Sequence, residues 1–124
     1  MDRENSIVYE KQFNSMPEQN YTRPAQIPLQ KKRFRYLIES YAPSTVDKWA
    51  MFHHPNHFII YDSVSRNCIF DATYQFLSGH YDKDAEDDAL VAVISEIRIN
   101  TDTTQFPPME DDFGVLMNII TVEL

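Results

Sequence analysis

Residues 57–62 and 67–74 form two short runs, HFIIYD and NCIFDATY, which are rich in β-branched and aromatic residues. Only four residues, SVSR, separate them. Two such runs with a connection of this length are typical of a β-hairpin, in which the strands lie antiparallel. The sequence therefore predicts an antiparallel sheet that contains a hairpin over residues 57–74.

Two helices are expected before this hairpin. Residues 30–41 carry apolar side chains every three or four positions and basic side chains on the other faces, which is the pattern of an amphipathic helix. A second short helix is expected from Ser44 to about His53. Ser44 and Asp47 are arranged as in a capping box, and Pro55 stops the helix.

Two later runs are expected to be strands. Residues 89–99 are rich in valine and isoleucine and favour a strand, although the acidic residues before them also suit the first turn of a helix. Residues 114–124 are β-rich as well. Residues 1–29, with three prolines, are expected to be an extended N-terminal arm that adds a short strand at 7–13. The predicted fold class is α+β: residues 30–124 form one domain, with two short N-terminal helices packed on a mostly antiparallel sheet of about four strands.

The size and the single cysteine restrict the class of protein. A chain of 124 residues with 43% apolar side chains is enough for one core. One cysteine cannot form an intrachain disulfide, so a reducing compartment is expected. The N-terminal residues are charged, and the longest apolar runs are shorter than the roughly 20 residues that span a bilayer. The sequence predicts a cytoplasmic protein without a membrane partner.

The charge of the chain is concentrated in its last third. The net charge is −8, and residues 82–124 contain eleven acidic side chains but only Lys83 and Arg98 as basic ones. Such a field repels DNA, RNA and anionic lipid and attracts basic surfaces. The basic residues of the stretch KKRFR, at 31–35, are expected on the solvent-exposed faces of the first helix and need no nucleic-acid partner. We therefore expect a basic protein as the partner and no direct contact with nucleic acid.

The sequence predicts no metal site, and the weak candidates are histidines. His53, His54 and His57 lie close together in the chain, and His80 is a further potential ligand. Pro55, however, breaks the helix that would place His53 and His57 on one ion. Polar surface histidines at a junction between helix and strand are the simpler interpretation, and no cofactor is expected.

Other catalytic and binding motifs are incomplete. Cys68 lies in an apolar strand and is expected to be a buried hydrophobic residue, so no catalytic residue is predicted. Residues 82–93 begin like a calcium loop, but Asp87 stands where a glycine is needed and Val93 where a bidentate glutamate belongs. The chain has only two glycines, which excludes a glycine-rich phosphate loop.

The favoured functional feature is an acidic, aromatic-containing binding face. Carboxylates accelerate association with basic surfaces, and aromatic neighbours supply buried anchors. Whether the two acidic clusters form one face depends on the length of the loops. The expected partner-binding residues are Tyr81, Asp82, Asp84, Glu86, Asp87 and Asp88 in one cluster, and Phe106, Glu110, Asp111, Asp112 and Phe113 in the other.

The function expected from this face is stoichiometric inhibition of a basic protein. In size and charge the chain resembles bacterial toxin-immunity proteins and phage counter-defence proteins, although it shares no motif with them. The carboxylates would occupy a cationic cleft, for example of a nuclease, in place of substrate phosphates. Two alternatives stay open: a small metal-dependent enzyme that uses the histidines of residues 53–57, and a structural or adaptor subunit that assembles through valine- and isoleucine-rich edge strands.

Overall fold

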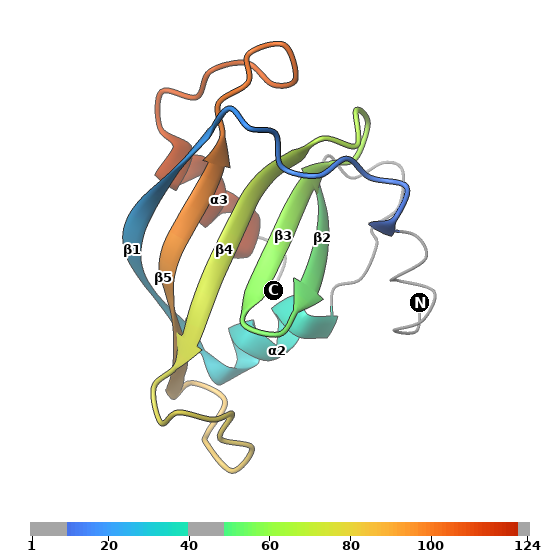
Figure 1. Cartoon of the computed structure of the whole chain (residues 1–124). Coiled ribbons are helices and arrows are strands. Elements are labelled where there is room, and N and C mark those ends of the chain that lie inside the picture. Colours follow the sequence, from blue (N-terminus) through green and yellow to red (C-terminus); the bar gives the residue numbers. More distant parts are fainter. Residues whose placement is uncertain (1–9, 40–48, 122–124) are drawn as a thin grey trace.

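The structure, a computed structural model of the chain, describes residues 10–39 and 49–121 (Figure 1). Over these residues the chain forms a five-stranded antiparallel sheet and two helices. The strands lie side by side in the order β1-β5-β4-β3-β2. In chain order, the elements are β1 (Asn20–Gln30), α2 (Lys31–Glu39), β2 (Trp49–His54), β3 (His57–Asp62), β4 (Cys68–Phe76), β5 (Leu90–Asn100) and α3 (Asp112–Thr121).

Helices α2 and α3 cover the same face of the sheet, and the main apolar core lies between them and the strands (Figure 1). Phe34 and Leu37 of α2, with Leu116 and Ile120 of α3, are each at most 2% exposed. They share one cluster with inward-facing side chains from all five strands. Burial of this apolar surface is the main force that holds the two layers together.

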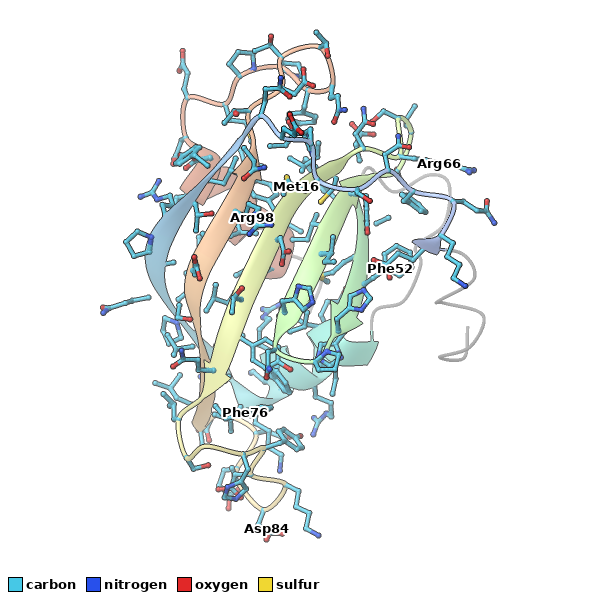
Figure 2. All side chains as sticks on the ribbon, in the orientation of Figure 1. Met16, Phe52, Arg66, Phe76, Asp84 and Arg98 are labelled. Atoms are coloured by element: carbon cyan, nitrogen blue, oxygen red, sulfur yellow. The ribbon has the colours of Figure 1, made fainter. Side chains whose placement is uncertain are left out.

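The opposite face of the sheet, called the open face below, is mostly polar. Neither α2 nor α3 covers it. It carries polar side chains of the central strands, such as Asp71, Thr73 and Arg98, because successive residues of a strand point to opposite faces. Figure 2 shows Arg98 near one end of this face. A second, smaller apolar cluster also lies here. It consists of Ala50, Phe52, Tyr61 and Cys68, with Phe13 and Met16 of the N-terminal segment packed on it.

Residues 20–29, which were expected in an extended arm, belong to strand β1 at one edge of the sheet. Their Ile27 and Leu29 are buried in the core, and pairing with β5 runs from Asn20 opposite Asn100 to Gln30 opposite Leu90. The prolines of this stretch fit an edge strand because only one side of it needs backbone donors. Of the short strand expected at residues 7–13, only residues 10–13 are described, and they form no strand.

The prediction of a second helix is wrong for residues 49–53, the part of it that the structure describes. Residues 44–48 lie outside the described part, and residues 49–53 belong to β2, which pairs with β3 from Trp49 opposite Asp62 to His54 opposite His57. The local capping signal is weaker than the gain from burying Ala50, Met51 and Phe52 in a sheet.

The expected C-terminal strand is also wrong, because residues 112–121 form helix α3. Leu116 and Ile120 lie four residues apart and are both buried against the sheet, so the run satisfies helical spacing in spite of its β-rich composition. The predicted fold of two N-terminal helices on about four strands is therefore incorrect. One helix lies mid-chain, one lies near the C-terminus, and the sheet has five strands.

Three sequence-based elements are confirmed. The hairpin is formed by β3 and β4, the amphipathic helix is α2, and the valine- and isoleucine-rich run is β5. Strand β5 lies between β1 and β4, so it does not offer the free edge that assembly through this run requires. In the part of the chain that the structure describes, no helix is long and apolar enough to cross a membrane.

Candidate functional site

Five acidic side chains project from the connection between β4 and β5, residues 77–89, which we call the acidic loop. It extends beyond the lower end of the sheet in Figure 1, and Figure 2 shows Asp84 at its tip. Lys83 is its one basic residue. The carboxylates at positions 82, 84, 86, 87 and 88 belong to exposed residues. The loop thus presents a concentrated negative charge to solvent.

The backbone of the acidic loop is tied to the start of helix α2. The amide N–H groups of Lys31 and Lys32 donate hydrogen bonds to the carbonyl oxygens of Ala89 and Asp87, at 2.8 and 2.9 Å. The ammonium group of Lys31, a residue only 8% exposed, donates to the carbonyl oxygens of Lys83 and Ala85. The loop therefore satisfies N–H groups that a helix N-terminus leaves without partners, and α2 in turn holds the loop in place.

Tyr81 anchors the loop in the apolar core. Its ring centre lies 5.5 Å from that of Phe34 and 6.0 Å from that of Phe76. The side chain is half-buried. Tyr81 was expected at a partner interface. In this structure its ring packs against Phe34 and Phe76 and so holds the acidic loop against the core.

The five carboxylates of the loop differ in their contacts. Asp82 accepts a hydrogen bond from the backbone N–H of Asp84 at 3.1 Å, which tightens the turn. Asp87 forms an ion pair with Arg35 at 3.2 Å. Among the residues that the structure describes, no hydrogen bond or ion pair involves the carboxylate of Asp84, Glu86 or Asp88. These three carboxylates are available to a partner.

The second acidic cluster lies at the opposite end of the sheet, around the loop of residues 101–111 (Figure 1). Strand β5, with 11 residues, separates the two loops. A strand of that length spans about 35 Å. The two clusters therefore do not form one continuous face.

Most of the second cluster is engaged within the molecule. Asp112 accepts hydrogen bonds from Arg23, at 2.9 Å, and from Tyr21. The guanidinium of Arg23 also lies 5.1 Å from the ring centre of Phe113. The carboxylate of Asp112 thus joins the start of α3 to the edge strand β1. Phe106 packs beside a tryptophan of β2, with 5.8 Å between ring centres.

Three of the histidines suggested as metal ligands, His53, His57 and His80, do not meet. His53 points toward the helix-covered face and forms a 2.8 Å hydrogen bond with the hydroxyl of Tyr74. His57 points to the open face, and His80 lies in the acidic loop. Within residues 10–39 and 49–121, no three histidine, cysteine or acidic side chains are grouped to hold a metal ion.

A pair of histidines on the open face was not predicted from the sequence. His54 and His57 lie opposite each other in the β2–β3 ladder, and each contacts a carboxylate, that of Glu10 or of Asp71. The local signal was the sequence HHPNH, because a two-residue Pro-Asn turn places the flanking histidines side by side. The carboxylates come from distant segments, which no local pattern identifies.

Cys68 has the environment of a structural residue. It is 2% exposed, in the small apolar cluster beneath Phe13. Burial, followed by the charges of Asp71 and Glu10, raises the pKa of its thiol to about 12. At neutral pH the side chain is therefore a thiol and not the thiolate that a nucleophile requires.

A wide groove is lined mainly by residues of β1, the edge strand, and of its neighbour β5. Its volume is about 990 Å³, and apolar side chains such as Leu77, Leu90 and Val93 contribute much of its lining. Arg23 is the charged residue in this lining, and it already pairs with Asp112. The groove thus lacks an unpaired charged group that would orient a ligand.

In comparisons with known proteins, no family model, no curated protein and no solved structure matches this chain.

Proposed function

We propose that this chain is a small inhibitor, of the immunity-protein or counter-defence kind, that blocks a basic protein through the acidic loop. One observation carries the proposal: Asp84, Glu86 and Asp88 expose carboxylates with no partner among the described residues, on a loop that Lys31 and Tyr81 hold in place. A loop that is already ordered loses little conformational entropy when it binds, so more of the electrostatic attraction is retained as affinity.

The chemistry of the loop favours a nucleic-acid-handling enzyme, such as a nuclease, as the target. The substrate cleft of such an enzyme is cationic because it binds phosphates. Carboxylates that enter this cleft occupy the phosphate positions and exclude the substrate. The net charge of −8 adds a long-range attraction that accelerates the encounter. The same field disfavours direct binding of nucleic acid or of an anionic membrane.

We further propose a cytoplasmic location. Cys68 is a free and buried thiol, and a protein without disulfides has no need of an oxidising compartment.

The proposal is tested with two variants of equal net charge. The loop variant carries Asp84→Asn, Glu86→Gln and Asp88→Asn. The control variant carries Glu18→Gln, Glu96→Gln and Glu110→Gln, which removes the same charge from exposed positions outside the loop. Each tagged protein is incubated with extract of its native cells at low and at moderate salt, and the proteins retained are quantified by mass spectrometry.

We expect a basic protein, retained in near-equimolar amount at low salt by the original chain and by the control variant but not by the loop variant. With the purified target, the loop variant should lower the association rate constant about 10-fold or more, since steering depends on these charges. It should also relieve inhibition of the target. Equal retention by the loop variant, or a target whose activity is unaffected by binding, would contradict the proposal.

A further inference from the structure

The two histidines on the open face lie at a distance from each other that suits two ligands of one ion. His54 and His57 flank a two-residue turn and lie directly opposite each other in the ladder of β2 and β3. Their ring centres are 5.2 Å apart, and the ring planes are inclined by 40°. Two imidazoles on one tetrahedral ion, with Zn–N bonds of about 2.0–2.1 Å, have ring centres about 5 Å apart. The observed separation therefore suits a shared ion.

Carboxylates select the tautomer of both rings. Nε2 of His54 lies 2.7 and 3.0 Å from the two carboxylate oxygens of Glu10, and Nδ1 of His57 lies 2.8 Å from Oδ1 of Asp71. An ionised carboxylate only accepts hydrogen bonds, so each of these nitrogens carries the proton and donates. In the neutral rings, Nδ1 of His54 and Nε2 of His57 then have the free lone pairs.

The carboxylates are themselves held in position. The side chain of Glu10 is 13% exposed, and Oε2 of Glu10 accepts a 2.6 Å hydrogen bond from the hydroxyl of Tyr61. Burial, and next the hydrogen bond to Glu10, raise the pKa of Tyr61, so its hydroxyl stays protonated and can donate. Asp71 lies in the central strand β4, and its side chain is 21% exposed. The imidazoles, by contrast, are each 33% exposed and open to solvent.

We propose that His54 and His57 bind a divalent transition-metal ion such as Zn²⁺ on the open face, through Nδ1 and Nε2 respectively. Histidines that ligate metals almost always donate their other N–H to a carboxylate, a carbonyl or a water, which fixes the ring and raises the basicity of the ligand. Both histidines have this arrangement. Since the chain supplies two ligands, water fills the remaining positions, and the ion exchanges readily or accepts a donor from another molecule. This site is independent of the acidic loop.

Direct binding of the metal alone tests the proposal. Protein freed of metal by a chelator is titrated with ZnCl₂ near neutral pH in an isothermal calorimeter. We expect one ion per chain, and loss of that binding in both His54→Ala and His57→Ala. The controls are His53→Ala, in the same strand but on the other face, and His80→Ala, in the acidic loop, and both should bind as the original chain does.

A positioning role for Asp71 provides a second test. Asp71→Asn keeps the shape of the side chain but removes its charge, and we expect the affinity for Zn²⁺ to fall about 10- to 100-fold. The melting temperature without metal should change little, which a merely structural role would not predict. If an alanine variant fails to fold by circular dichroism, His57→Gln replaces it. The proposal is overturned if no binding occurs at millimolar Zn²⁺, or if the His54 and His57 variants bind as the original chain does.

Discussion

Asp111 and Asp112 stand at the start of α3, and both use their carboxylates within the molecule. Oδ1 of Asp111 accepts the backbone N–H of Gly114 at 2.9 Å, and Asp112 pairs with Arg23. Asp84 and Glu86, by contrast, direct their charge to solvent. Residues of one chemical type therefore have different roles at the two ends of the sheet: Asp111 and Asp112 stabilise the fold, whereas Asp84 and Glu86 are available to a partner.

Cys68 should be almost unreactive in the folded protein. Its raised pKa, about 12 against an ordinary 9.0, leaves very little thiolate at pH 8, and burial blocks access. We expect alkylation by iodoacetamide to be about 100-fold or more slower in buffer than in denaturant, where the ordinary pKa returns. The rate is measured by mass spectrometry, with a small free thiol as the reference. Rapid alkylation while circular dichroism shows a folded chain would disprove the buried assignment.

At the scale of the element, the beginnings of the two helices are stabilised differently. The first N–H groups of α2 donate hydrogen bonds to carbonyl oxygens of the acidic loop, whereas α3 is capped by the side chain of Asp111. The absence of a side chain at Gly114 permits this cap, since a Cβ there would collide with the carboxylate of Asp111. The second acidic cluster thus serves helix formation.

Replacement of Asp111 should separate capping from charge. Asp111→Ala removes the acceptor for the N–H of Gly114 and is expected to lower the free energy of unfolding by about 1 kcal/mol. Asp111→Asn removes the charge but keeps a good capping group, so stability should be nearly unchanged. Urea unfolding curves measure both. Equal destabilisation by the two substitutions would show that the charge of Asp111, and not its hydrogen bond, matters.

At the scale of the whole molecule, the sheet separates three regions. The helices and the main core occupy one face, the histidine pair lies on the other, and the acidic loop extends from one end (Figure 2). A target at the acidic loop and an ion on the open face therefore occupy different surfaces. Both depend on the sheet keeping its shape, which in turn depends on the packing of α3.

Truncation of a core residue in α3 should reveal this dependence. Leu116 is 0% exposed, and Leu116→Ala is expected to lower the free energy of unfolding by about 2–5 kcal/mol, through lost apolar burial and the cavity that remains. The control is Val64→Ala in the β3–β4 loop, where the side chain is 84% exposed, with an expected change within about 0.5 kcal/mol. Chemical denaturation measures both. A similar small effect of both substitutions would mean that α3 does not pack on the sheet as described.

The local sequence was sufficient to predict those elements for which residue composition, spacing and connection length all favour the same structure. The β3–β4 hairpin combines two β-rich runs with a short connection, and α2 combines helical spacing with basic outer faces. The excess of acidic residues after position 81 is read directly from the sequence, because it does not depend on how the chain folds.

Tertiary contacts decided the rest, because local signals conflicted or were absent there. The cap signal at Ser44 favoured a helix, but pairing with β3 makes residues 49–54 a strand. The β-rich C-terminal run favoured a strand, but burial of Leu116 and Ile120 four residues apart makes it a helix. The separation of the acidic clusters, the anchoring by Lys31 and the carboxylates beside the histidines join segments far apart in the chain. Their positions follow from how the chain packs, and the pattern along it does not encode them.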